Sequence, residues 1–432
     1  MALIFDRLND DIFLIILSYL QRRDLSALSL TCKHFHKLSS PRRWTALATH
    51  KALYVSWWHD NIGTNARYVR EILVVVNERA PMLPDVLFAT KNIRFEGGPS
   101  VSGDLLSLLS AIKSFPRLYV LILKHFTPTT AVDIACHPSF PSIQQLTLHD
   151  VTEPATDLFY LCPNVTSLRL GLNVFHQAHE SRPRWRSSPI PRLTLTALRM
   201  EARDFMVSFL EQRPMRATHV RLSALWEFTW DGISSMQDET ASQLACVLTT
   251  LTPRSLYLEI PAILCADLSD RTGTLWQEVA AAAPHLRALV LHVDSSLSDD
   301  DTRWAPPDAL VAELARLTLT CVHLKADPYL CWRKGDADRP RLRALAAFPG
   351  ELAAAIPTLR VVGVSDGSRK LEGPRSTQWW RVEGGDGDGA VRSLVELWRE
   401  DGERALRLVQ SEAFCASDLD DIYSEKCRYV RG

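Results

Sequence analysis

Residue types that could perform catalysis are present in this chain, but their spacing places no nucleophile beside a base. The 13 histidines are spread along 432 residues, and an exposed position on a helix explains His34 and His36. The sequence has no G-x-S-x-G, no H-E-x-x-H and no phosphate-binding glycine loop, the patterns that fix a nucleophile, a metal or a phosphate. We therefore expect that the chain is not an enzyme and holds no cofactor and no metal.

The cysteines also lack the spacing of a reactive site. None of the 9 cysteines belongs to a C-x-x-C pair, the common arrangement in zinc and thiol–disulfide sites. Cys162 and Cys246 lie within apolar runs, so we expect their thiols to be buried and unreactive. Dispersed cysteines are typical of reduced thiols inside the cell, and we expect a cytoplasmic or nuclear location.

Two stretches have residue types that suit binding better than catalysis. Trp226, Phe228 and Trp230 alternate at strand spacing, and large aromatic residues are frequent anchors of protein interfaces, although they would also pack beneath a long loop. Residues 182–192, RPRWRSSPIPR, gather arginines that include Arg184 around a tryptophan. Clustered arginine captures acidic or phosphorylated segments, but a solvated loop explains this run as well.

The overall composition is that of a folded protein without a strong net charge. Lys and Arg number 49 against 50 Asp and Glu, and 46% of the residues are hydrophobic. The whole-chain charge therefore gives no indication of nucleic acid as a partner. No apolar run reaches the roughly 18 residues that a membrane-spanning helix needs, so we expect no membrane association.

The elements that would present a binding surface begin with an apolar helix. Residues 12–20, IFLIILSYL, follow an N-capping residue type at Asn9. On a helical wheel the apolar side chains surround this helix, so every side of it needs a cover. Two short helices, capped by Asp24 and Thr31, are expected before Pro41 ends the unit, and they can cover one side. The other side indicates a protein partner, unless the segment is simply the N-terminal cap of the next domain.

The run LNDDIFLIILSYLQRRDLSALSLTCKHFHKL resembles the F-box motif over residues 5–45. The positions that fall on the motif without a gap are Leu8, Asp11, Ile12, Ile16, Leu17, Ser18, Tyr19, Leu20, Asp24, Leu25, Leu28, Cys32, Lys33, Phe35 and Leu38. Asn9 stands where the family usually has proline. The resemblance implies a three-helix module that docks on a Skp-type adaptor and, through it, on a cullin. The adaptor-binding residues that it implies are Leu8, Asn9, Ile12, Ile16, Leu17, Leu20, Leu25, Leu28 and Phe35.

The rest of the chain carries a recurring strand pattern. The motif L-x-x-L-x-L returns about every 20 to 40 residues, as expected of a repeat protein. The apolar residues at its centre, called anchors below, are Ile72, Ile93, Leu121, Leu146, Leu168, Leu198, Val220, Leu256, Leu289, Val322 and Val362. A proline precedes several anchors by five residues, at Pro116, Pro141, Pro163, Pro284 and Pro357, and marks a junction between helix and strand. Helices are expected between strands at 105–112, 240–251, 276–283 and 308–317.

This pattern resembles the degenerate leucine-rich repeats that follow F-boxes of the fungal type. We therefore predict an α/β fold with a three-helix F-box at 5–45, a helical linker at 46–66 and an irregular leucine-rich-repeat solenoid, an α/β horseshoe, at 67–375. A C-terminal cap helix and tail should occupy 376–432, with the helix at 391–409. A conventional α/β sheet domain fits the same alternation of helix and strand.

Together the two resemblances imply the substrate-recognition subunit of an SCF-type (cullin–RING) ubiquitin ligase. The F-box would hold the adaptor, the repeats would hold an unknown protein client, and catalysis would be proximity, with degradation of the client as the outcome. A non-degradative interaction scaffold would need the same two parts and stays open as an alternative. Polar residues that alternate with the anchors, such as Arg169, Arg221 and His323, should face solvent by the period of a strand. The candidate client-binding residues are Arg169, Arg184, Arg221, Trp226 and Trp230.

Overall fold

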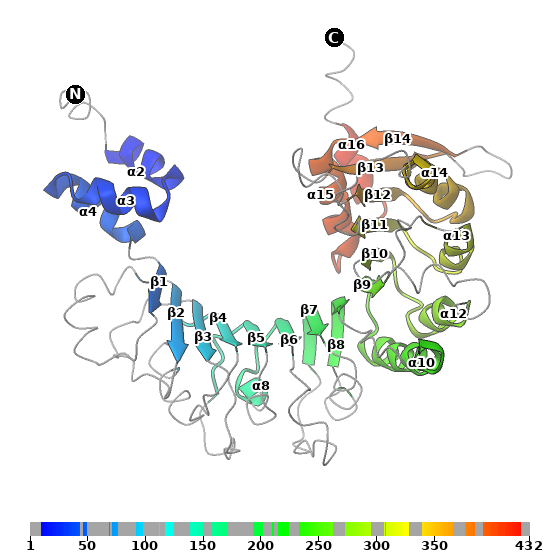
Figure 1. Ribbon diagram of the computed structural model, residues 1–432, viewed down its shortest axis with the longest axis horizontal. Helices are drawn as coiled ribbons and strands as arrows, with labels where there is room; N and C mark the ends of the chain where they lie inside the picture. Colours follow the sequence, from blue (N-terminus) through cyan, green and yellow to red (C-terminus); the bar gives the residue numbers. More distant parts are fainter. Residues whose placement is uncertain are drawn as a thin grey trace, which may run out of the picture. The chain divides into compact units, whose positions relative to one another are not determined.

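The computed structural model contains two compact units, Met1–Arg184 and Trp185–Gly432. It describes residues 10–43, 46–49, 69, 71–76, 92–97, 112, 117–124, 139–149, 158–171, 193–201, 210, 215–223, 233–261, 273–294, 306, 308–327, 339–366, 376–384 and 392–424. Figure 1 shows helices at the start of the chain, followed by strands and then by strands that alternate with helices. None of the helices in these ranges is both long and apolar enough to cross a membrane.

The described part of the chain begins with three short helices, as the sequence predicts. They are α2 at Asp10–Tyr19, α3 at Arg22–Ser29 and α4 at Lys33–Arg43. Both α2 and α3 pack on α4. The buried side chains Phe13, Leu17 and Leu25 lie in this helical segment, and the Phe13 ring meets the Phe35 ring edge to face with centroids 5.1 Å apart. This apolar contact fixes which side of α2 faces the other helices.

Three details of the helix boundaries differ from the prediction. Gln21 precedes α3, and Asp24 lies in its first turn, where a carboxylate favours the positive end of the helix. Cys32 precedes α4, and its Sγ accepts a hydrogen bond from the Phe35 N–H at 3.5 Å, the role expected of Thr31. Pro41 lies within the last turn of α4, so its missing N–H removes one hydrogen bond and does not end the helix before it.

The strands of the first unit pair in chain order, and all of the pairs are parallel. They are β1 at Ala46–Thr49, β2 at Glu71–Val76, β3 at Asn92–Gly97, β4 at Val120–Lys124, β5 at Gln145–His149 and β6 at Ser167–Gly171. A short helix, α8 at Leu158–Leu161, lies between β5 and β6. Strand β1 falls inside the range expected to be a helical linker, because Leu47 pairs with the anchor Ile72 and extends the ladder.

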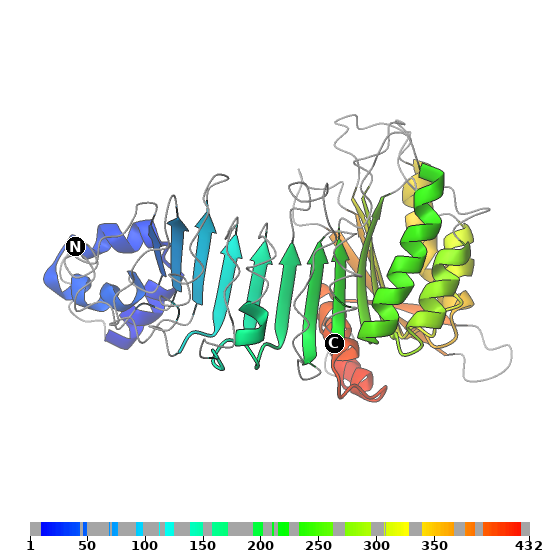
Figure 2. The same cartoon turned by 90° about the horizontal axis from the view of Figure 1, so that it is seen from below.

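The second unit is a mixed sheet with helices on both faces. Its strands are β7 at Leu193–Glu201, β8 at Met215–Ser223, β9 at Ser255–Pro261, β10 at Ala288–Asp294, β11 at Cys321–Asp327, β12 at Val361–Asp366, β13 at Ser376–Glu383 and β14 at Ser393–Leu397. Strands β7 to β12 are parallel neighbours, whereas β12, β13 and β14 pair antiparallel. Helices α10 (Ile233–Leu251), α12 (Gly273–Ala282), α13 (Asp308–Leu314) and α14 (Arg339–Ala355) lie on one face (Figures 1 and 2).

The anchors named from the sequence lie in register within each unit. In the first unit Ile72, Ile93, Leu121, Leu146 and Leu168 are cross-strand partners. In the second unit the partners are Leu198, Val220, Leu256, Leu289, Val322 and Val362. From Leu121 onward these anchors are buried. The prediction of one strand at each anchor is therefore confirmed, in a mixed α/β sheet.

The prolines before the anchors occupy one recurring turn. The residue before each proline accepts a hydrogen bond from the N–H three residues later, in the pairs Phe140–Ile143, Cys162–Val165, Ala283–Leu286 and Ile356–Leu359, at 3.0 to 3.2 Å. Proline suits the second position of such a turn because its ring fixes φ near the required value. The expected junction of helix and strand is confirmed at Pro163, Pro284 and Pro357, the same turn precedes β5 at Pro141, and Pro116 lies outside the described residues.

The helices between strands follow the prediction in part. The expected segments 240–251, 276–283 and 308–317 fall on α10, α12 and α13. Of the segment 105–112, only Ile112 belongs to the described residues, and it is helical. Helix α14 has no counterpart in the prediction, and it continues through Pro349.

The C-terminal part differs from the single cap helix expected at 391–409. Residues 393–397 form the strand β14, and the helix α15 covers only Arg399–Gln410. Helix α15 packs on β10, β12 and β13, and it lies on the face opposite α10, α12, α13 and α14 (Figure 1). A last helix, α16 at Asp418–Ser424, follows it and packs against it. The C-terminal segment therefore covers a face of the sheet instead of capping its end.

Candidate functional site

An exposed apolar surface on α2 is the first candidate site. Its large side chains, called the α2 patch, are Ile12, Leu14, Ile15, Ile16 and Tyr19, with exposed fractions from 42% at Ile16 to 84% at Tyr19. The helix can expose them because the polar positions that usually face solvent are filled by apolar residues in this sequence. So much apolar surface on a three-helix unit is a mark of a protein interface. Ile12 and Ile16 are two of the expected adaptor-binding residues.

The other expected adaptor-binding residues divide into three groups. Leu17 and Leu25 are buried within the unit's own core, because they lie on the side of their helices that packs inward, so we correct their assignment to the adaptor-binding surface. Leu20, Leu28 and Phe35 are half-buried, and Phe35 packs on Phe13. The remaining two residues, Leu8 and Asn9, lie outside the described residues.

The second candidate site is the face of the second unit's sheet on which α15 lies, called the α15 face. The side chains on this face alternate with the buried anchors and begin one residue after each anchor. One row across the strands is therefore Arg199, Arg221, Tyr257, Val290, His323 and Gly363, in register. The row two residues further along includes Glu259, His292, Lys325 and Ser365.

Helix α15 covers the end of this face that lies on β10 to β13. Trp379, on β13, is fully buried, and a Cβ atom at Gly363 would lie 2.6 Å from its ring. Gly402, on α15, lies against the Cβ and Cγ end of the same side chain. These two glycines leave the room that the indole fills, and Ala405 and Val409 of α15 complete the buried cluster.

Arginine side chains hold the end of α15 to the sheet. Arg287 donates from Nε to the Val409 carbonyl at 2.7 Å and also to the Ser411 carbonyl. Arg254 donates to the Glu412 carbonyl at 2.5 Å. The last carbonyls of a helix lack partners within it, so these donors satisfy and neutralise the negative end of α15.

His323 is buried, which contradicts the expectation that it faces solvent. Its exposed fraction is 6%, because the Trp379 ring lies over it with centroids 4.6 Å apart. The local alternation is as predicted, but the segment that covers this position comes from more than fifty residues away in the sequence. Burial, and in second place the charge of Lys325, lower the pKa of His323 to about 3.

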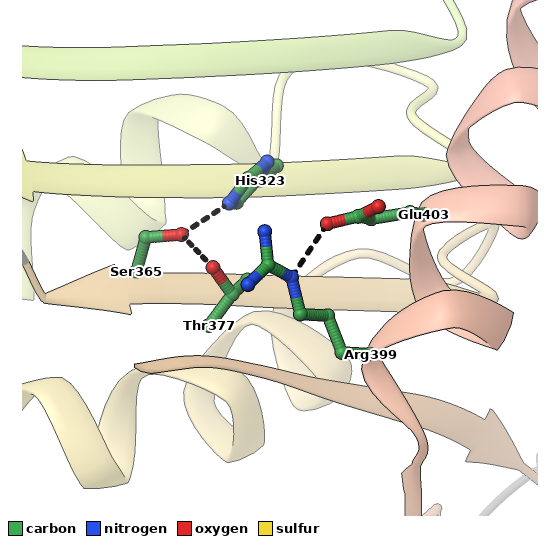
Figure 3. Close-up of polar contacts among 5 residues, drawn as sticks. All are labelled: His323, Ser365, Thr377, Arg399 and Glu403. Atoms are coloured by element: carbon green, nitrogen blue, oxygen red, sulfur yellow. Dashed lines mark hydrogen bonds and ion pairs between the residues drawn. The ribbon is translucent and has the colours of Figure 1, made fainter. Parts of the chain in front are cut away.

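The structure brings His323 next to a serine, a pairing that the sequence spacing did not indicate. Its Nε2 lies 2.8 Å from Ser365 Oγ, which lies 2.8 Å from Thr377 Oγ1 (Figure 3). A serine–histidine pair can serve as nucleophile and base, but a base with a pKa near 3 accepts a proton poorly. Both residues are also buried. The ion pair at the start of α15, Arg399 with Glu403 at 2.7 Å, is drawn in the same view (Figure 3).

Strands β8 to β11 also carry half-buried charged and aromatic side chains on the α15 face. The Arg221 guanidinium lies 4.0 Å from the centre of the Tyr257 ring, and Lys325 Nζ lies 5.2 Å from it. The Tyr257 hydroxyl is 3.0 Å from His292 Nδ1, and Glu259 is 3.6 Å from the same nitrogen. The sequence analysis missed Tyr257 and Lys325, although both stand at odd positions after an anchor.

The candidate client-binding residues are placed as follows. Arg169, on β6, is half-buried in the first unit, and Arg221, on β8, is half-buried in the second. Each alternates with buried leucine or valine anchors, as expected. Arg184, Trp226 and Trp230 lie outside the described residues.

Thiols and metal-binding groups offer no further site in the described ranges. Burial raises the pKa of Cys162 and of Cys321 to about 12, so these thiols stay protonated. Cys246 is exposed, which corrects the expectation of burial, because Leu244, Val247 and Leu248 take the inward side of α10. Among the residues that the structure describes, no group of three or more His, Cys, Asp or Glu could hold a metal ion.

Comparison with known families agrees with the N-terminal resemblance. A family model described as F-box-like matches residues 5–54, a range that takes in α2, α3, α4 and the strand β1. A search of curated proteins finds no match to the chain. Residues 5–54 are therefore an F-box-like domain, and such domains generally indicate a receptor subunit that binds the Skp-type adaptor of an SCF ubiquitin ligase.

Proposed function

We propose that this chain is a substrate-recognition subunit of an SCF-type (cullin–RING) ubiquitin ligase. The F-box-like domain would hold a Skp-type adaptor and, through it, a cullin. The strand-and-helix repeats, which we propose to be degenerate leucine-rich repeats, would hold a protein client. The chain itself would supply no reacting group and would act in the cytoplasm or the nucleus by placing the client beside a charged ubiquitin carrier.

The observation that carries this proposal is the exposed apolar side of α2. Burying one isoleucine fully is worth about 1.5–3 kcal/mol, so the residues of the α2 patch together supply the free energy of a stable protein interface. Leu17 and Leu25 support this surface from beneath, since they pack inside the helical unit. The half-buried Leu20, Leu28 and Phe35 would form its margin.

The test is co-purification of the adaptor with lysine variants of the patch. Ile12→Lys combined with Ile16→Lys should weaken adaptor binding by at least about 100-fold, because two apolar contacts are lost and two charges must be desolvated. Leu342→Lys is the matched control, since Leu342 lies on α14 and has the same exposed fraction as Ile16, 42%. The control should bind the adaptor as the wild type does.

Full adaptor binding by the Ile12/Ile16 variant would contradict the docking model.

A second measurement separates a degradative subunit from a scaffold: the abundance of captured proteins with and without a proteasome inhibitor. A degradative subunit should hold more of its client when the proteasome is blocked, and only with an intact α2 patch. Equal amounts under both conditions would favour the non-degradative scaffold.

A further inference from the structure

We propose that the sheet surface beneath α15 is a binding site for an amphipathic helix of the protein client, which replaces α15 when it binds. This surface, called the α15 seat, consists of Ala288, Cys321, His323, Val361 and Trp379, all of which are buried. The identity of the partner as a client rests on the proposed function. The composition of the α15 seat and the attachment of α15 to it do not depend on that function.

The α15 seat is partly polar, whereas the opposite face of the same strands is aliphatic beneath its helices. The residues on that opposite face include Leu289, Leu291, Val322, Leu324, Val362 and Val364. In the α15 seat, by contrast, the His323 ring lies against the Trp379 ring. His323 Nδ1 and Trp379 Nε1 are buried, and neither atom has a hydrogen-bond partner among the described residues. Covering the seat with α15 therefore removes two polar groups from water without replacing their hydrogen bonds, which weakens the attachment.

The buried side chains of α15 are small. They are Gly402, Ala405 and Val409. Leu406 and Leu408 pack at the margin of the cluster and are half-buried. Helix α14, on the opposite face, buries larger side chains, among them Leu345, Phe348 and Leu352. The free energy of attachment rises with the apolar area that is buried, so the sheet loses less of it when α15 leaves than when α14 does. Segments with little buried apolar surface are the ones that open locally in a folded protein.

The polar contacts at the end of α15 are mostly with its main chain. Arg254 and Arg287 donate hydrogen bonds to carbonyl groups there, and Gln410 Nε2 adds a side-chain contact with Ser255 Oγ at 3.0 Å. Every helix presents unpaired carbonyl groups in its last turn, so the two arginines can hold the end of a client helix in the same way. These arginine contacts therefore position a helix without selecting for the sequence of α15.

The space beside Trp379 sets the main requirement for a client helix. A Cβ atom at Gly402 would collide with Trp379 Cγ, so the client needs glycine at the equivalent place. Ala405 and Val409 follow three and seven residues later and pack in the same cluster, a spacing by which a helix docks in an apolar groove. A client helix with a hydroxyl or amide side chain near His323 and the indole would also satisfy the two unpaired atoms, which gives it an advantage over α15.

The experiment measures binding of a fluorescent peptide with the sequence of residues 398–412 to the full chain by anisotropy. In the wild type the tethered α15 occupies the α15 seat at a high effective concentration, so we expect weak binding. Gly402→Leu in the chain prevents its own α15 from seating, and this variant should bind the peptide at least about 10-fold more tightly. The matched control is Gly350→Leu, since Gly350 on α14 has open space around it, and it should bind as the wild type does. A peptide that itself carries Gly402→Leu should bind to none of these chains.

Labelling of Cys321 reports the state of the α15 seat in the same variants. Cys321 is buried in the wild type and should not react with a thiol reagent while α15 is in place. In the Gly402→Leu chain it should react, and an excess of the unmodified peptide should protect it again. Cys162, buried in the first unit, should stay unreactive in every variant and shows that this unit is folded.

Three results would overturn the inference: no gain of peptide binding in Gly402→Leu, an equal gain in Gly350→Leu, or a Cys321 that stays protected in Gly402→Leu. If Gly402→Leu fails to fold, as judged by its thermal transition, Gly402→Ala decides. Its smaller overpacking should still label Cys321 about fivefold or more faster than Gly350→Ala does, and equal rates would show that α15 is a fixed part of the core.

Adaptor co-purification keeps the two proposals separate. A chain that binds the adaptor but whose Gly402 variants reject the peptide refutes the α15 seat alone. Peptide binding by Gly402→Leu without adaptor binding by the wild type refutes the proposed ligase role alone.

Discussion

Two glycines in helices should respond in opposite directions when they are replaced by alanine. Gly402 in α15 faces Trp379, and a Cβ atom there would collide with the Cγ and Cβ atoms of that residue. Gly350 in α14 has open space where a Cβ atom would be, with no atom within 4 Å. The pair therefore isolates the packing of α15 on the sheet from the general effect of a Gly-to-Ala change in a helix.

Two contributions set the expected changes in the free energy of unfolding: helix propensity acts at both sites, and overpacking acts only at Gly402. Alanine is better than glycine in a helix by about 1 kcal/mol, and this gain applies to both sites. At Gly402 the added methyl group overpacks a buried site, which costs about 1–3 kcal/mol, and the ring cannot turn away because its Cβ atom is involved. We expect Gly350→Ala to raise the free energy of unfolding by up to about 1 kcal/mol, and Gly402→Ala to be about 1–3 kcal/mol less stable than Gly350→Ala.

Urea denaturation of the full chain, followed by far-ultraviolet circular dichroism, measures both variants as shifts of the transition midpoint at unchanged slope. Trp398→Ala is a useful companion, because this tryptophan is exposed and its replacement should change stability by less than about 0.5 kcal/mol. Equal stabilisation by Gly402→Ala and Gly350→Ala would refute the contact between α15 and Trp379, and with it the statement that α15 covers this face.

Two further predictions concern titration and thiol reactivity. Because burial lowers the pKa of His323 to about 3, unfolding takes up a proton there as the pH falls below about 6.5; stability should drop by about 1.4 kcal/mol per pH unit toward pH 3. His323→Gln should flatten this slope in urea titrations at several pH values, and an unchanged slope would assign the acid loss to other groups. Cys32, Cys246 and Cys415 are exposed and should react with a thiol reagent in the native state, Cys415 fastest, because a hydrogen bond from Ser417 lowers its pKa. Mass spectrometry of the labelled chain should find Cys162 and Cys321 unmodified until the protein unfolds, and early labelling of either would show that its site opens.

The strands that carry an anchor, β2 to β12, could be predicted from the sequence because they depend on local patterns, whereas β1, β13 and β14 do not carry the pattern and were missed. The apolar pattern marks the buried side of a strand, and at five of the anchors a preceding proline marks the turn before it as well. Helix α14 was missed because Pro340, Pro349 and Gly350 are usual signs of a break. In the structure Pro340 lies in the first turn, where its missing N–H costs nothing, and packing keeps the rest of the helix intact.

The candidate site residues could be predicted only where a local sequence pattern contains them. Ile12 and Ile16 were found because a motif in continuous sequence contains them, but the motif did not separate them from the buried Leu17 and Leu25. His323 and Tyr257 stand at equivalent positions, one residue after an anchor. One is covered by Trp379 and α15, while the other stays accessible, and that difference depends on a segment distant in the sequence. No local pattern contains this information.

The antiparallel turn-back at β13 limits how this protein can change its length. A repeat can be inserted or lost between β7 and β9, since each new parallel strand offers its neighbours the same edge; between β9 and β12 it would separate the contacts of α15 with Arg254, β10 and β12. After β12 the free edge is taken by β13, in the opposite direction, and the glycine at position 363 is matched to the tryptophan that follows. A repeat inserted after β12 would separate Gly363 from Trp379. New repeats can therefore be added only within the parallel part of the sheet, and the C-terminal segment must stay joined to the last parallel strand.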